Sequence, residues 1–218
     1  MKPDSLIYTA SGLTPTGAYA KLGKLAAENQ LAVDRVSIVK LDEWLGLPLD
    51  DAHTCESFLR QNVLEPPWIP ADRYIGFDSQ PADEFAECRR IESEIQASGG
   101  IDLAILGIGV NGHIGLNEPA EFLQSGCHVA DLAPTTVGHT MLEGTADRVT
   151  RGLTMGMRDI LASRRILLLV FGGQKAKPIR ELLKKRVTAR FPASFLCLHP
   201  NVTYLCDQAV APDIVGAA

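Results

Sequence analysis

The chain has 218 residues, of which 46% are hydrophobic and 22% charged, and its formal net charge is −5. These values are typical of a soluble globular protein and exclude a globally disordered chain, and the lack of a basic surplus argues against a nucleic-acid partner. No apolar run approaches the roughly 18–20 residues of a membrane span, and the first residues, MKPDSLIYTASG, lack the apolar core of a signal peptide, so we expect a cytoplasmic protein with no membrane partner.

The first half of the chain alternates between short apolar runs and longer amphipathic stretches. Residues 5–9 predict a strand, and a helix is expected over 16–30. A second strand is expected over 35–41 and a helix over 54–64, ended by Pro66 and Pro67. Residues 82–98 predict another helix, which Gly99 and Gly100 end.

The second half continues the alternation. We expect a strand over 101–106, a helix over 153–163, a strand over 165–171, a basic helix over 175–186, and two closing strands over 194–198 and 202–206. Continuous apolar strands separated by helices indicate an α/β fold, doubly wound and Rossmann-like, with a mostly parallel sheet and helices on both faces. We expect one domain over residues 1–218.

Ligands of such sheets bind outside the carboxyl ends of the strands. Four predicted strands end in polar or flexible clusters: residues 11–14, Asp42 and Glu43, residues 107–117, and residues 172–175. Because parallel strands bring these ends to one edge of the sheet, we expect the active site there.

The loop after the first strand reads TASGLTPTG and precedes a helix. Backbone N–H groups at a helix start, together with Ser and Thr hydroxyls, suit a phosphate. The loop lacks the Lys-Ser/Thr pair of a Walker A loop, since Ala18 and Tyr19 stand there. In the simpler alternative, Thr14 only caps the helix and Pro15 begins it.

Residues 107–112 match GxGxxG, but the breakers Gly115, Asn117 and Pro119 leave little room for the helix that a dinucleotide site requires. The same segment holds His113 and Glu118, two titratable groups at a strand end. They either move protons, as histidine does near neutral pH, or cap a turn and face water.

Asp42 directly follows a strand, where a carboxylate is either a helix cap or a base directed into the cleft. Lys175 opens a helix, where a cation opposes the helix dipole, and this suggests a bound anion, although a solvated lysine is the more frequent case. Lys184, Lys185 and Arg186 are expected in the last turn of that helix, on a solvated face.

The five cysteines are Cys55, Cys88, Cys127, Cys197 and Cys206. Their number is odd and none forms a CxxC pair, which argues against a disulfide framework and a zinc knuckle. We expect buried or neutral thiols and no metal site.

Four segments together resemble the glucosamine-6-phosphate deaminase/isomerase family. They are residues 11–15, the block LDEWLGLP at 41–48, the block LGIGVNGHIGLNEP at 106–119, and GLTMG at 152–156 with Gln174 and Lys175. The segments KLDEWLGLPL, HTCESFL, VTRGLT and FPASFLCLHPN look closest to the galactosamine-6-phosphate deaminase/isomerase branch.

The resemblance implies conversion of an amino-sugar 6-phosphate into a ketose 6-phosphate and ammonia, without a cofactor or a metal. His113, supported by Glu118 and Asn111, would open the sugar ring, and Asp42 would carry the proton from C2 to C1. The resemblance also implies substrate or phosphate contacts, which we expect from Ser11, Gly12, Thr14, Glu43, Gly109, His139 and Lys175.

Three departures from the family pattern stand out. Asn111 occupies a position where many members carry Asp, so a fully ionic relay is absent. A family arginine has no obvious counterpart; His139 lies near that position, and we expect it to help define the sugar stereochemistry. The chain also begins a few residues before its first strand, so either the fold tolerates the loss of an amino-terminal element or the chain is truncated.

Two other functions remain as alternatives. A 6-phosphogluconolactonase-type hydrolase has a related fold, but its histidine block resembles Gly-x-Asp-Gly-His-Thr, whereas this chain reads Asn-Gly-His-Ile-Gly-Leu-Asn-Glu. A non-catalytic sugar-phosphate sensor would need a DNA-binding segment, and none precedes residue 1. Glucosamine 6-phosphate stays open as the substrate, and a homo-oligomer stays open as the assembly.

Overall fold

The computed structural model describes residues 4–65, 69–138 and 140–210. Two sheets organise this part of the chain. The larger has six strands in the order β4-β2-β1-β5-β8-β9, and every pairing in it is parallel. Its strands are β1 (Leu6–Thr9), β2 (Ser37–Lys40), β4 (Tyr74–Ile75), β5 (Leu103–Gly107), β8 (Ile166–Val170) and β9 (Val202–Cys206). The prediction of a mostly parallel sheet is confirmed.

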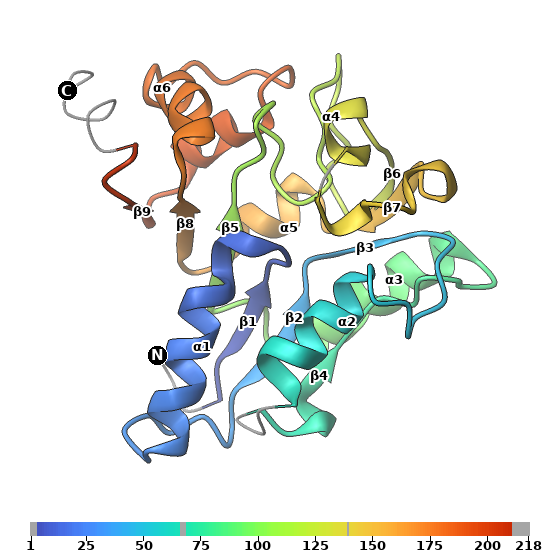
Figure 1. The fold of residues 1–218 in the computed structure, drawn as a ribbon, viewed down its shortest axis with the longest axis vertical. Coiled ribbons are helices and arrows are strands. Elements are labelled where there is room, and N and C mark those ends of the chain that lie inside the picture. The colour runs from blue at the N-terminus through green and yellow to red at the C-terminus, as the bar shows by residue number, and fades with distance from the viewer. Residues whose placement is uncertain (1–3, 66–68, 139, 211–218) are drawn as a thin grey trace.

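Side chains alternate between the two faces of this sheet, and both faces are apolar. On β1, Tyr8 packs with Ala104 and Leu168 in one core, while Ile7 packs with Ile105 in the other. The first core is completed from α3 (Glu84–Ala97), α5 (Met157–Leu161) and α6 (Ala176–Leu183). The second is completed from α1 (Leu13–Ala27) and from α2 (Cys55–Leu59) with the π-helical turn Arg60–Leu64, and α1 and α2 lie on the near side of the strands in Figure 1. The sheet is therefore covered on both faces, as the doubly wound fold requires.

A second, three-stranded antiparallel sheet was not predicted. Its order is β3-β7-β6, formed by β3 (Asp42–Trp44), β7 (Arg151–Thr154) and β6 (His128–Asp131). The backbone passes from the large sheet to the small one at Leu41, whose N–H donates to Thr9 in β1 and whose carbonyl accepts from Met155. Asp42 therefore begins a strand and caps no helix. The short α4 (Pro134–Val137) follows β6.

Several predicted boundaries are wrong, each for a local reason. The helix after β1 begins at Leu13 with Gly12 (φ 101°) as its N-cap, so Thr14 does not cap it and Pro15 lies within its first turn. The helix expected over 153–163 is shorter, because Leu153 and Thr154 pair with β3 and β6. The strand expected over 194–198 is a 3-10 helix, Pro192–Leu198, with a proline in its first turn.

The basic run also lies elsewhere than predicted. Helix α6 ends at Leu183, so Lys184 is its C-cap and Lys185 has left-handed backbone (φ 54°). Pro66, Pro67 and His139 lie outside the described residues. No helix in the described ranges is long and apolar enough to cross a membrane.

The junction of β2, β3 and α2 holds a fully buried cation between two buried carboxylates. The Lys40 ammonium lies 2.7 Å from Glu43 Oε2 and 2.8 Å from Glu56 Oε2. Although burial lowers the pKa of Lys40, the two carboxylates outweigh it and hold that pKa above its ordinary value. Tyr74 also donates a short hydrogen bond to Glu56. The three charges are therefore mutually dependent.

We expect Lys40→Met to lower the free energy of unfolding by about 3–5 kcal/mol, because it leaves Glu43 buried without a cation and leaves Glu56 paired only with the exposed Arg60. Urea unfolding at pH 7 measures the change. Lys24→Met is the matched control, since the Lys24–Glu28 pair is exposed, and should change stability by less than about 1 kcal/mol. A loss at Lys40 no larger than at Lys24 would contradict the importance of the buried network.

Candidate active site

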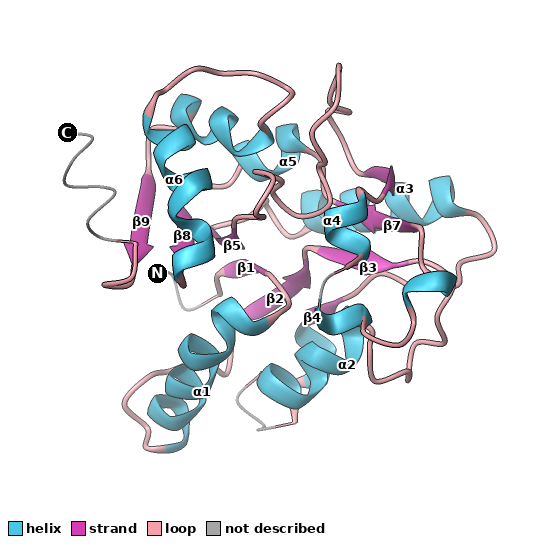
Figure 2. Cartoon of the chain, turned by 45° about the horizontal axis from the view of Figure 1, so that its top comes forward, coloured by secondary structure: helices cyan, strands magenta, loops and turns pink. Residues whose placement is uncertain are grey.

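A cavity of about 400 Å³ opens at the carboxyl ends of the central strands. The chain reverses direction across the sheet between β1 and β5, since β2 and β8 extend to opposite sides of this pair. Ligands of doubly wound sheets bind at such a switch point. Figure 2 shows α4 and α6 standing around these strand ends. The wall of the cavity includes residues from all four predicted strand ends: Ser11, Gly12, Thr14, Asp42, Gly109, His113 and Lys175.

Asp42 lies on the cavity side of β3 because side chains alternate along a strand. Asp42 and Trp44 both line the cavity, while Glu43 between them points to the opposite face. Burial, and after it the charge of Glu43, raises the pKa of the Asp42 carboxyl to about 6, opposed by the thiol of Cys55 and the charges of His113 and Lys40. A carboxylate of this kind can accept a proton near neutral pH.

Glu43 was expected to contact substrate, and this expectation is wrong. Its side chain is fully buried and does not line the cavity. One carboxylate oxygen binds Lys40 and the N–H of Glu56, and the other accepts from the N–H groups of Trp44 and Cys55. Glu43 therefore fixes the start of α2 relative to β3 and has no lone pair directed at a ligand.

The Nδ1 atom and the backbone N–H of His113 lie next to a group of polar side chains. Its Nδ1 lies 3.4 Å from Glu118 Oε2 and 3.2 Å from Thr136 Oγ1. Its backbone N–H donates to Asn111 Oδ1, and its ring packs so closely on Gly109 that a Cβ there would come within 2.6 Å of ring atoms. Gly109 thus has a steric role beside the imidazole.

Glu118 does not face water, contrary to the simpler of the two expectations. Only 10% of its side chain is exposed. Asn111 Nδ2 donates to Glu118 Oε2 at 2.8 Å, and Thr136 donates a short hydrogen bond to Oε1. Although burial raises the pKa of Glu118, the hydrogen bonds from His113, Thr136 and Asn111 outweigh it and lower that pKa. Because the Asn111 amide is a donor, it supports an ionised Glu118, which an ionised Asp at this position would oppose.

Another group of residues that lines the cavity suits an anion. Gly12 has φ 101° at the start of the 15-residue α1, and Ser11, Gly12 and Thr14 line the cavity there. Lys175 lines the same cavity, its pKa is lowered by burial alone, and no acidic side chain in the described ranges pairs with it. A partly buried cation that lacks a counter-ion beside a helix start favours a bound phosphate.

Thr135, Thr136, Met141 and Cys55 also line the cavity, and sequence reasoning missed them. Thr136 lies on α4, which follows the unpredicted β6, so no pattern in the sequence placed it beside His113. Cys55 was treated only as a neutral thiol. The motif HTCESFL was the one signal that could have singled it out.

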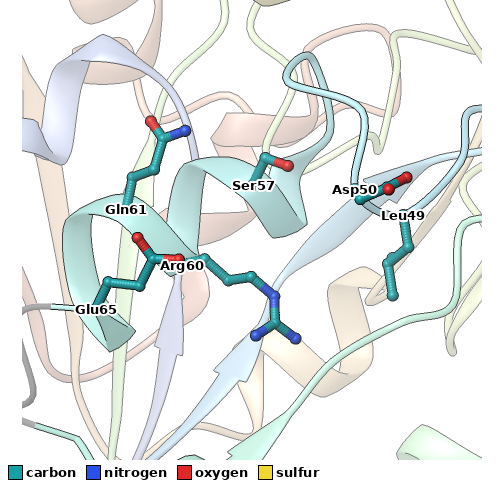
Figure 3. A pocket seen from close by; sticks show the side chains of 6 residues that line it. All are labelled: Leu49, Asp50, Ser57, Arg60, Gln61 and Glu65. Carbon is teal, nitrogen blue, oxygen red and sulfur yellow. The ribbon is translucent and has the colours of Figure 1, made fainter.

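A second cavity, of about 430 Å³, lies over α2 and the turn that follows it (Figure 3). Two of its polar side chains have partners within the chain: Arg60 pairs with Glu56 at 2.8 Å, and Ser57 Oγ donates to the Asp51 carbonyl. The walls are Leu49, Asp50, Ser57, Arg60, Gln61 and Glu65. This cavity lacks the paired acid–base groups of the first one.

Comparisons with known proteins identify the family of the chain. The family model described as glucosamine-6-phosphate isomerases/6-phosphogluconolactonase matches residues 6–205. An Escherichia coli K12 protein named for an inferred deaminase activity, AgaI, is 43% identical over 94% of this chain and 80% of its own. The glucosamine-6-phosphate deaminase of Halothermothrix orenii is 38% identical over 97% of this chain and 88% of its own.

Two solved structures resemble this chain in fold. A monomeric glucosamine-6-phosphate deaminase matches with a TM-score of 0.89 and 36% identity, over 97% of this chain and 88% of its own. The 6-phosphogluconolactonase of Thermotoga maritima matches with a TM-score of 0.72 and 23% identity, over 94% of this chain and 87% of its own. The second likeness concerns the fold alone.

We expect Asp42→Asn to stabilise the folded protein by about 1–3 kcal/mol at pH 8. The pKa of Asp42 rises to about 6 on folding, so the fold favours the protonated carboxyl. Its contribution to stability is therefore fully present below the unfolded pKa of about 4 and is lost as the pH rises through about 6. Urea unfolding at pH 8 and pH 4.5 measures the effect, which should shrink at the lower pH.

The matched control is Asp34→Asn, which removes an exposed carboxylate and should change stability by no more than about 0.5 kcal/mol at either pH. If Asp42→Asn is destabilising at pH 8, the buried carboxylate is not the strained group that its surroundings indicate.

Proposed function

The chain belongs to the glucosamine-6-phosphate isomerase/6-phosphogluconolactonase family, and we propose that it is an amino-sugar 6-phosphate deaminase/isomerase that converts galactosamine 6-phosphate and water into tagatose 6-phosphate and ammonia. The observation that carries the proposal is one cavity lined by a buried carboxylate, by a histidine next to a second carboxylate, and by Lys175 with the start of α1. Relatives named as glucosamine-6-phosphate deaminases support the reaction class. The galacto preference rests on the sequence segments that resemble that branch.

Binding begins at the phosphate in this proposal. Lys175 and the start of α1, with Ser11, Gly12 and Thr14, hold the phosphate at one end of the cavity. The sugar ring then lies between Asp42 and His113, which face the same space. The attraction for the anion is local, so the overall charge of −5 does not prevent binding.

Ring opening is assigned to His113. The imidazole moves a proton to the ring oxygen as the C1 hydroxyl loses one, which gives the open-chain aldose. Glu118 stabilises the charged imidazole, and Asn111 and Thr136 hold Glu118 in place.

Isomerisation is assigned to Asp42. Its carboxylate takes the proton from C2 while O1 gains a proton from the substrate's own ammonium group, which gives an enol-amine. The carboxyl then returns its proton to C1, so one carboxylate on one face of the substrate serves both steps. The product is a C2 imine, and water adds to it and releases ammonia. The reaction balances with one water consumed and one ammonia formed, and each proton transfer contributes typically about 10²–10⁴-fold in rate.

Ammonia release from galactosamine 6-phosphate and from glucosamine 6-phosphate, measured side by side, tests the proposal. We expect faster turnover of the galacto sugar and a loss of at least about 10²-fold in Asp42→Asn, because the shuttle is removed. Asp34→Asn serves as the surface control and should retain activity. Faster turnover of the gluco sugar would keep the mechanism and overturn the galacto preference.

Absence of ammonia from both sugars, with hydrolysis of a 6-phosphogluconolactone, would replace the proposed function with the lactonase. Binding of a sugar phosphate without turnover of any of the three compounds would instead favour the sensor. The same assay addresses His139, to which we assign a part in sugar stereochemistry. An unchanged ratio between the two sugars in His139→Ala would contradict that role.

A further inference from the structure

The Asp42 carboxylate has one hydrogen-bond donor among the described residues, and it is a thiol. Cys55 Sγ donates to Asp42 Oδ1 across 3.6 Å, and both side chains are buried. The other carboxylate oxygen, Oδ2, lies toward Gly115, where a Cβ would come within 3.5 Å of it. Gly115 lines the cavity. Oδ2, which accepts no hydrogen bond from the thiol, is therefore the carboxylate oxygen on the cavity side.

The position of Cys55 is fixed by hydrogen bonds from its own backbone N–H and from those of its neighbours in α2 to the side chains of Thr54 and Glu43. Thr54 is the N-cap of α2, and its hydroxyl accepts from the N–H of Ser57 at 3.0 Å. Glu43 accepts from the N–H of Cys55 at 2.9 Å and from that of Glu56 at 2.8 Å. Glu43 is adjacent to Asp42 in β3, so the residue beside the carboxylate also holds the helix turn that carries the thiol.

We propose that Cys55 is a positioning residue for the proton shuttle: its S–H fixes the Asp42 carboxylate through Oδ1, so that Oδ2 is presented to the C1–C2 side of the substrate. The inference deepens the proposed function and rests on it. No covalent step involves the sulfur, and Cys55 acts only through Asp42.

The surroundings keep this thiol in its donor form. Burial, with the charges of Glu43 and Asp42, raises the pKa of the Cys55 thiol well above its ordinary value. A neutral thiol donates a hydrogen bond without adding charge, and a hydrogen bond to a carboxylate favours its ionised form. The same buried, neutral state makes Cys55 a poor nucleophile.

Other groups around Asp42 cannot take over this role. Glu43 on the same strand opposes ionisation of Asp42, while Lys40 on β2 and His113 in the loop after β5 favour it by charge alone. Burial, and after it the charge of Asp42, raises the pKa of Tyr19 on α1, whose hydroxyl donates instead to the Ala10 carbonyl at 2.8 Å. Removal of the thiol therefore leaves the carboxylate without a directional partner.

The experiment compares Cys55→Ala, Cys55→Ser and wild-type protein, with Cys88→Ala as a control that removes another buried thiol, on α3 and away from the cavity. The pH dependence of kcat and KM is measured with galactosamine 6-phosphate and glucosamine 6-phosphate. In Cys55→Ala we expect the acid limb of kcat to rise by about half to one pH unit and kcat at pH 7 to fall roughly tenfold, with KM within about twofold. Cys55→Ser, which keeps a donor, should restore most of both.

A wild-type acid limb and kcat in Cys55→Ala would overturn the inference, as would an equal effect in Cys88→Ala. If Cys55→Ala does not fold, as judged by its thermal unfolding, Cys55→Val replaces it, since it fills the space without a donor. A failure of the proposed function is seen separately, because wild-type protein would then release no ammonia. Equal losses in Cys55→Ser and Cys55→Ala would show that the sulfur only fills space, and would also overturn the inference.

Discussion

The Lys40 ammonium, enclosed between Glu43 and Glu56, is the interaction on which the site depends. A carboxylate as deeply buried as Glu43 is costly to the fold without a cation beside it. Glu43 pairs with Lys40 and also accepts from three backbone N–H groups, those of Trp44, Cys55 and Glu56. One ion pair thereby joins β2, β3 and α2 at the edge of the cavity.

Because side chains alternate along β3, the two adjacent carboxylates take different roles, one structural and one chemical. Asp42 and Trp44 face the cavity and Glu43 faces the ion-pair network, so adjacent carboxylates have opposite environments. Glu43 is paired and saturated with hydrogen bonds, whereas burial and the charge of Glu43 raise the pKa of Asp42 to about 6. The fold keeps one of two neighbouring acids as a structural anion and leaves the other able to exchange a proton.

The large sheet and the position of the site were predictable, because parallel apolar strands have a strong sequence pattern and their ends must meet. Four separated clusters do line one cavity, and the resemblance placed Asp42, His113 and Lys175 on its walls. The small antiparallel sheet was not predictable. Its strands have three or four residues and include polar or glycine positions such as Gly152, which pairs with Trp44. The position of Thr136 and the orientation of Glu43 depend on that sheet, so neither could be predicted from the sequence.

Asn111 stands where many family members carry Asp, and its contact with Glu118 explains how an amide can serve there. In this structure the side-chain amide of Asn111 donates to Glu118 Oε2, and its side-chain carbonyl accepts from the backbone N–H of His113. A donor at that position stabilises the charge of Glu118, and Thr136 adds a second donor on the other oxygen. Glu118 can then remain ionised beside His113 when the histidine gains its proton. A protonated His113 is stabilised by one carboxylate, that of Glu118. The Asn111 amide holds Glu118 in its ionised form, whereas a second carboxylate at that position could remain beside Glu118 only if the two shared a proton.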